Sequence, residues 1–176
     1  QFWANRLAAE KDPDVRAQAA RAIGERQGGG SDQLIAALKD PDAQVRMWAA
    51  ISIGRKKMER AAPQLFAALG DEDAFVRHTV QQALRKINDW KPAKEQLDSD
   101  NATQRQATLV ALTGVYHDDA VAALAWAVMS AKHPDIRAAA LEALAEVHHQ
   151  ADPYVKGWWG TQPAKGKPAR SKIHDW

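Results

Sequence analysis

The sequence predicts an all-α fold: a right-handed α-α superhelix, or HEAT-like solenoid, of about five helical hairpins with an extended aromatic C-terminal tail. Three observations support this prediction. A short motif built on aspartate and arginine recurs about every 30 residues. Small or aliphatic residues follow each arginine at helical spacing. No segment shows the polar–apolar alternation of a half-buried β-strand.

Composition agrees with a single helical domain. The chain has 176 residues, of which 45% are hydrophobic and 26% are charged, enough to bury a core. No stretch approaches the roughly 18 apolar residues that a membrane helix needs. The absence of cysteine excludes disulfides, thiolate metal sites and covalent haem attachment within this sequence. Because the first residue already lies in a helical pattern, we expect a piece of a longer protein.

The recurring motif places the turns. It reads Asp-Pro-Asp-Val-Arg at residues 12–16 and returns, with variations, at 40–46, 71–77, 98–105 and 133–137. Its arginines are separated by 30, 31, 28 and 32 residues, and apolar or small residues stand three, six and seven positions after each of them. An aspartate followed by proline is a good helix start, because the carboxylate caps free N–H groups and proline at the first turn loses no hydrogen bond.

Each motif is therefore the turn of a helical hairpin. A first helix precedes the turn, as in Gln33–Lys39, Gln64–Leu69, Ala93–Leu97 and Ala120–Ala131, and a second helix follows it. The five hairpins are expected at about 1–27, 31–58, 61–88, 90–115 and 118–148. The fourth lacks proline in its turn and has Gln104 where valine is expected, so we expect irregular packing there.

The motif resembles a known family. The sequence Asp-Pro-Asp, Val-Arg, Ala-Ala and Ala-Ile-Gly, in that order, is similar to HEAT-like repeats of the short class named for phycobilisome lyases. The resemblance covers about residues 2–147. It implies a scaffold fold, because this repeat is used mainly to present surfaces rather than to catalyse reactions.

The arginines form a column that we call the arginine ladder. We predict that each arginine pairs with turn aspartates of its own or the adjacent repeat, since a guanidinium suits a partly buried carboxylate. The alternative is a ladder that binds phosphates or acidic partners. The predicted structural residues are Arg16, Arg46, Arg77, Arg105, Arg137, Asp14, Asp42, Asp73, Asp100 and Asp135.

The second helices are expected to line the concave surface that solenoids use for binding. There the sequence predicts an exposed apolar cluster of Met47, Trp48 and Ile51 with a basic rim of Arg21, Arg55 and Lys86. Such a patch suits a protein or peptide partner. The alternatives are that Trp48 packs between repeats or is covered by another domain of the same chain.

Catalytic and metal motifs are not evident in the sequence. The six histidines lack the one-face spacing of a metal site on helices, and no phosphate-binding loop or nucleophile motif occurs. We therefore expect no enzyme activity, no metal and no cofactor in this segment. Residues 1–150 hold 19 basic and 20 acidic residues, a balance that argues against nucleic acid as the partner.

The amino-acid composition of the chain changes after residue 150. Residues 151–176 contain several prolines and glycines together with Tyr154, Trp158 and Trp159, and carry five basic against two acidic residues. We predict a solenoid domain at 1–150 and, at 151–176, a tail whose aromatic residues pack on the solenoid end or lead to a next domain. A carbohydrate platform is the alternative for the paired tryptophans.

The tail sequence has a resemblance of its own. Trp158-Trp159-Gly160-Thr161 with the following proline is similar to the segment after the repeats in large secreted bacterial proteins. Those proteins join a dehydrogenase-like propeller, helical repeats and a PVC-type haem-binding domain. The resemblance implies a periplasmic or secreted scaffold fragment whose redox domains lie outside this sequence.

The expected function is thus a non-catalytic scaffold that contacts protein surfaces or neighbouring domains of the same chain, without a membrane span and monomeric when isolated. Two alternatives remain open. One is a bilin-lyase-like subunit that handles a chromophore. The other is a HEAT-like nucleic-acid-binding protein, which would need a more basic concave face.

Overall fold

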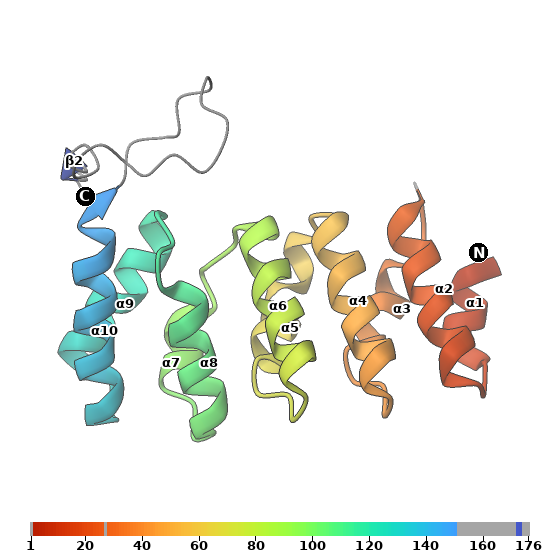
Figure 1. The fold of residues 1–176 in the computed structure, drawn as a ribbon, viewed down its shortest axis with the longest axis horizontal. Coiled ribbons are helices and arrows are strands. Elements are labelled where there is room, and N and C mark those ends of the chain that lie inside the picture. The colour runs from red at the N-terminus through yellow and green to blue at the C-terminus, as the bar shows by residue number, and fades with distance from the viewer. Residues whose placement is uncertain (1, 27, 151–171, 174–176) are drawn as a thin grey trace, which may run out of the picture.

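The computed structural model describes residues 2–26, 28–150 and 172–173 and has five successive helical hairpins (Figure 1). The first helices are α1 (Phe2–Ala9), α3 (Ser31–Ala37), α5 (Ala62–Ala68), α7 (Ala93–Leu97) and α9 (Asp118–Ser130). A short 3-10 helix, η1 (Glu59–Ala61), leads into α5. The second helices are α2 (Pro13–Glu25), α4 (Ala43–Arg55), α6 (Ala74–Ile87), α8 (Ala102–Leu112) and α10 (Pro134–Val147). The predicted all-α solenoid is confirmed.

The helix starts follow the motif. Asp42 and Asp73 each cap a second helix by accepting hydrogen bonds from two backbone N–H groups of its first turn. Asp12 caps α2 through the N–H of Asp14, and Asn101 caps α8 through the N–H of Gln104. These side chains satisfy donors that a helix cannot satisfy internally, which fixes where each second helix begins.

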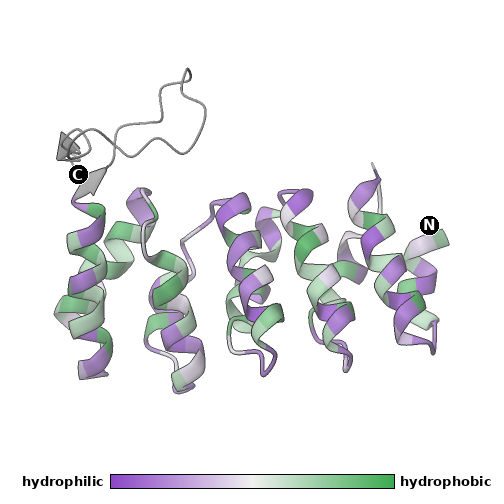
Figure 2. Cartoon of the chain, viewed as in Figure 1, coloured by the Kyte–Doolittle hydropathy of each residue, from purple (hydrophilic) through white to green (hydrophobic). Residues whose placement is uncertain are grey.

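The second helices form one layer and the first helices the other. In Figure 1 the second helices stand side by side in front of the first helices. The core lies between neighbouring hairpins and is built mainly from alanine, leucine, isoleucine and valine, with the larger side chains of Phe66 and Trp90 fully buried. Figure 2 shows that the turns at the ends of the hairpins are mainly hydrophilic. Because the helices lie in two layers, the second helices together form one continuous surface.

Close packing of the second helices depends on small residues. A Cβ atom placed on Gly24 would lie 2.8 Å from the Cα of Ser52, and one placed on Gly54 would lie 2.9 Å from the Cα of Ala83. The Ser52 hydroxyl also donates a 2.8 Å hydrogen bond to the Ala20 carbonyl of the preceding hairpin. Because helix backbones meet here directly, α2, α4 and α6 form the most tightly packed part of the layer.

The junction before the fourth hairpin is looser. Helices α6 and α8 contact each other much less extensively than α4 and α6 do. Gln104, at the position where valine was expected, reaches the Phe66 carbonyl and the Gln96 side chain. Trp90, in the connection between hairpins, is buried and donates from Nε1 to Asn88. A polar residue thus replaces apolar packing at this junction, in keeping with the irregularity expected from sequence.

After α10 the chain forms one antiparallel strand pair. β1 (His149–Gln150) pairs with β2 (Lys172–Ile173), which brings residues 172 and 173 back to the end of α10. The predicted tail residues Tyr154, Trp158 and Trp159 lie outside the described residues. Within the described helices, none is long and apolar enough to span a bilayer.

Candidate docking site and the arginine ladder

Trp48 lies close to cations from two adjacent repeats. The guanidinium of Arg21, on α2, lies 5.2 Å from the centre of a Trp48 ring, and that of Arg55, on α4, lies 5.8 Å away. Both distances are within the range of cation–π attraction. Glu25 joins the two arginines, with oxygen–nitrogen distances of 2.9 Å to Arg21 and 3.6 Å to Arg55. We call Arg21, Glu25, Trp48 and Arg55 the Trp48 cluster.

The apolar residues of this site are less exposed than expected. Met47, Trp48 and Ile51 are all half-buried, and Met47 and Trp48 pack against the core. The expected freely exposed apolar patch is therefore corrected: all three side chains are half-buried, and the close approach of α2 and α4 places Trp48 partly in the interface between these helices. The alternative in which Trp48 packs between repeats describes this burial better, while part of the ring remains accessible beneath two arginines.

The cationic rim is exposed. Arg21, Arg55 and Lys86 are exposed side chains on α2, α4 and α6, one from each of three consecutive second helices. Lys86 lies close to Gly54, since a Cβ atom built there would be 3.6 Å from the Cδ of Lys86. The structure thus places these three cations on consecutive second helices of one layer.

Glu25 was not singled out from the sequence. Its hydrogen bond with Arg21 is the first cause that lowers its pKa, and the charges of Arg21 and Arg55 add to the effect. Glu25 stands four residues after Arg21, a spacing typical of helical ion pairs, and this spacing was the signal that could have identified it. Its carboxylate offsets one of the two arginine charges over Trp48.

The arginine ladder has one repeating geometry. In four repeats the Nη1 atom of the arginine donates to two backbone carbonyls of its own turn, as Arg46 does to Asp40 and Pro41 at 2.9 and 3.0 Å. The equivalent donors are Arg16, Arg77 and Arg105, and Arg137 donates to the single carbonyl of Ala131. This anchor directs the Nε edge of each guanidinium toward the next turn.

In the first two repeats that edge binds a carboxylate. Arg16 donates from Nε and Nη2 to Asp40, both at 2.9 Å. Arg46 donates in the same way to Asp71 at 2.7 and 3.0 Å. The side chains of Arg46 and Asp71 are only 9% and 8% exposed, so this bidentate pair is largely shielded from water.

The predicted aspartates do not fill this position. Asp42 and Asp73 are helix caps, and Asp14 contributes its backbone N–H to the cap formed by Asp12. Asp100 contributes its carbonyl to Arg105, and Asp135 accepts from the Gln106 side chain. The carboxylates that bind the arginines instead stand two residues before the cap, because only that position faces the guanidinium of the preceding repeat.

The ladder ends where this position changes. The residue two before the cap is Asp40 and then Asp71, but it is Ser99 in the fourth turn and Ala131 in the fifth. Ser99 keeps part of the local role, since its hydroxyl accepts from the Asn101 N–H as Asp71 accepts from that of Asp73. Neither Arg77 nor Arg105 has a carboxylate partner among the described residues.

No group of three or more histidine or acidic side chains suited to a metal ion occurs in the residues that the structure describes. A shallow groove of about 320 Å³ follows the turns of the second and third hairpins, lined by Asp40, Arg46, Gln64 and Asp71 among others. The ladder itself occupies part of this groove.

Comparisons with known proteins agree with this geometry. Residues 31–97, from α3 to α7, match the sequence model of the HEAT-repeat family, so this segment is similar to HEAT repeats. No curated protein matches the sequence. The crystal structure of an engineered protein is similar over 85% of this chain and 81% of that chain, with 17% identity and a TM-score of 0.47.

Proposed function

We propose that this chain is a non-catalytic scaffold that binds a protein surface or a neighbouring domain through the Trp48 cluster. HEAT repeats generally act as protein-interaction scaffolds. The supporting observation is the half-buried Trp48 ring, with two exposed arginines over it, on a close-packed layer. Tryptophan and arginine are the side chains most enriched at binding hot spots, and a rigid layer lowers the entropy lost on binding.

The proposed partner segment follows from the chemistry of the cluster. Arg21, Arg55 and Lys86 favour an acidic segment, while the half-buried Met47 and Ile51 favour an apolar anchor beside it. A segment with both features would release Glu25 from the arginines and replace its carboxylate. This surface would then recognise its partner by shape and charge, and it would catalyse no reaction.

Selection of linear peptides from a random library tests the proposal. We expect enriched peptides that combine acidic residues with one apolar or aromatic anchor. Trp48→Ala should weaken their binding about 30-fold, the typical cost of losing a hot-spot side chain. The double variant Arg21→Ala with Arg55→Ala, which removes only exposed side chains, should weaken it about tenfold.

Lys39→Ala is the matched control, because Lys39 is an exposed cation in the α3–α4 turn, away from the Trp48 cluster. It should leave peptide binding unchanged. Peptides that bind all these variants equally well would place the binding surface elsewhere and contradict the proposal.

We further propose that the chain belongs to a larger exported multidomain protein and holds neighbouring domains in fixed geometry. The support is the Trp-Trp-Gly-Thr sequence of the tail, which resembles the segment after the repeats in large secreted bacterial proteins. Sequencing the flanking gene regions tests this proposal. A propeller-sized β region upstream and a Cys-x-x-Cys-His motif downstream are expected, and further plain repeats on both sides would exclude it.

A further inference from the structure

The guanidinium of Arg105 is buried but incompletely bonded. Arg105 is 8% exposed, close to the 7% of Arg46, and its Nη1 atom makes the same two bonds to backbone carbonyls as in the other repeats. Its Nε atom, however, is buried and has no hydrogen-bond partner within the described part of the chain. A buried charged donor without an acceptor is costly, so an acceptor is expected at this place.

The repeat geometry shows where that Nε edge points. Arg46, anchored in the same way, places Nε and Nη2 on the carboxylate of Asp71, two residues before the cap of α6. The equivalent residue before α10 is Ala131, which is buried and has no side-chain acceptor; its backbone carbonyl accepts from Arg137. The Nε edge of Arg105 therefore faces a position at which the first two repeats have a carboxylate and this repeat has none.

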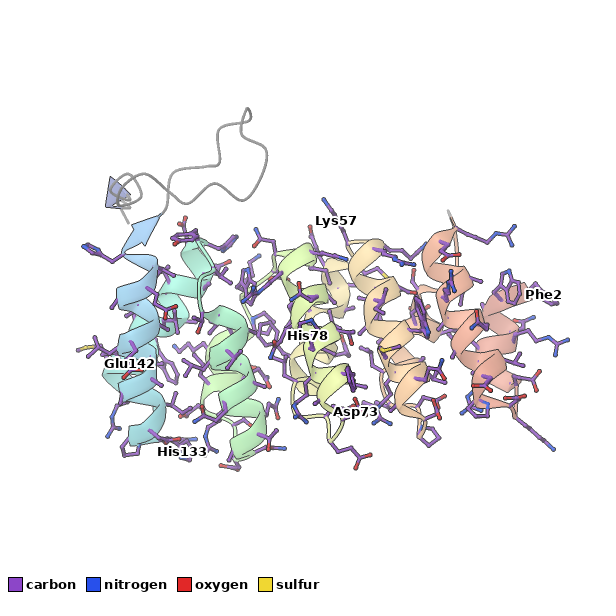
Figure 3. All side chains as sticks on the ribbon, viewed as in Figure 1. Phe2, Lys57, Asp73, His78, His133 and Glu142 are labelled. Atoms are coloured by element: carbon purple, nitrogen blue, oxygen red, sulfur yellow. The ribbon has the colours of Figure 1, made fainter. Side chains whose placement is uncertain are left out.

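A second unpartnered nitrogen belongs to the same turn. His133 stands at the cap position of α10 but makes no capping hydrogen bond, and its Nε2 atom is buried without a partner. Figure 3 shows His133 at the end of α10 where that helix stands beside α8. An imidazole nitrogen that carries hydrogen is a second possible donor at this turn.

The neighbouring carboxylates are already engaged. Asp98 accepts from the backbone N–H of Lys132 at 2.9 Å and lies 3.1 Å from its ammonium group. Asp135 accepts from the side chain of Gln106. Neither carboxylate is bonded to Arg105, and Lys132 adds a positive charge beside the turn.

We propose that the Nε edge of Arg105 is a binding site for an external carboxylate, which occupies the place that Asp71 occupies beside Arg46. The class of ligand follows from the repeat itself, because two preceding repeats bind a carboxylate at this edge with bidentate geometry. The carboxylate belongs either to a small molecule or to an acidic side chain of a bound polypeptide. This site is independent of the Trp48 cluster.

The Nε–H resonance of Arg105 in ¹⁵N NMR spectra tests the proposal. It is assigned by its loss in Arg105→Lys and followed during titration with acetate, with chloride at equal ionic strength as the control. We expect a saturable shift with acetate and none with chloride. A blocked peptide containing one aspartate, compared with its asparagine counterpart, distinguishes the two sources: tighter binding of the aspartate peptide than of acetate identifies a polypeptide ligand.

Ala131→Asp is the matched variant. It restores the carboxylate that the first two repeats have, so it should shift the Arg105 resonance in the absence of ligand and abolish the response to acetate. The proposal is overturned if acetate and the aspartate peptide both leave the wild-type resonance unmoved, if chloride gives the same shift, or if Ala131→Asp responds to acetate as the wild type does. A failed peptide selection at Trp48 has no bearing on these outcomes.

Discussion

At the scale of single residues, the turn aspartates perform two separate tasks. Asp42 and Asp73 cap helices, whereas Asp40 and Asp71 bind the arginine of the preceding repeat. The two positions differ by two residues in sequence but face different partners. Burial is the largest influence on the pKa of Asp40 and raises it, but hydrogen bonds from Arg16 and from the Asp42 N–H together outweigh burial and lower the pKa.

This shift predicts a pH dependence of stability. Because the pKa of Asp40 is lower in the folded chain than its ordinary value of 3.8, the unfolded chain binds the proton more readily. The stabilisation from Asp40 is complete above that ordinary value and is lost as the pH falls through the folded value. Asp40→Asn should cost about 2 kcal/mol at neutral pH and should lose less stability on acidification than the wild type below about pH 4.

Urea unfolding between neutral and acid pH measures both effects. Asp32→Asn is the control, since Asp32 pairs with Arg60 on the open surface, with side chains 80% and 58% exposed. It should cost less than about 1 kcal/mol. Equal costs for the two variants would show that the ladder pair contributes no more than a surface pair.

At the scale of elements, the distance between second helices is set by glycine. Gly54 lies in the last turn of α4, and replacement of glycine by alanine within a helix is ordinarily stabilising. Here the new Cβ atom would lie 2.9 Å from the backbone Cα of Ala83 on α6. Tertiary contact therefore opposes helix propensity at this position.

Gly54→Ala should destabilise the chain by about 2 kcal/mol, because α4 and α6 must move apart to admit the methyl group. Thermal or urea unfolding measures the change. Gly29→Ala is the control, since no atom lies within 4 Å of the added Cβ there and the backbone is not left-handed. If Gly54→Ala is neutral or stabilising, then the two helices are free to adjust and their close approach is not required.

At the scale of the whole molecule, the strength of the interfaces between repeats decides whether the solenoid unfolds as one cooperative unit. In repeat arrays each unit contacts its neighbours alone, so a weak interface divides the array into parts that unfold separately. The α6–α8 junction has limited helix contact, a polar Gln104 and an arginine, Arg77, without a carboxylate partner among the described residues.

Native-state hydrogen exchange should therefore show two levels of protection. Amides of α7 to α10 should open with a lower free energy than those of α4, which is packed on both sides. Ser99→Asp supplies the carboxylate that Arg77 lacks and should raise the opening free energy of α7 to α10 by about 1 kcal/mol. Uniform protection in the wild type, or no response to Ser99→Asp, would contradict this division.

The sequence by itself determined the all-α class, the five hairpins and their approximate bounds. These features depend on local chemistry that repeats along the chain: caps at Asp42 and Asp73, proline at helix starts and apolar residues at helical spacing. The cationic rim of Arg21, Arg55 and Lys86 could be placed for the same reason, since helical spacing puts Arg21, five residues after Arg16, on the same line as Arg55 and Lys86, each nine residues after its ladder arginine.

Only the tertiary structure decided which groups pair. Which of two nearby aspartates faces Arg46 depends on how adjacent turns stack, and the spacing in the sequence fits either of them. The half-burial of Trp48 depends on how closely Gly24 lets α2 approach α4. The Nε atom of Arg105 has no hydrogen-bond partner among the described residues, because Ala131 stands at the position equivalent to Asp71 and has no carboxylate. Ala131 is 26 residues away in sequence, and only the stacking of the repeats places it next to Arg105. Local sequence fixes helices, whereas interatomic distances between repeats decide ion pairs and sites.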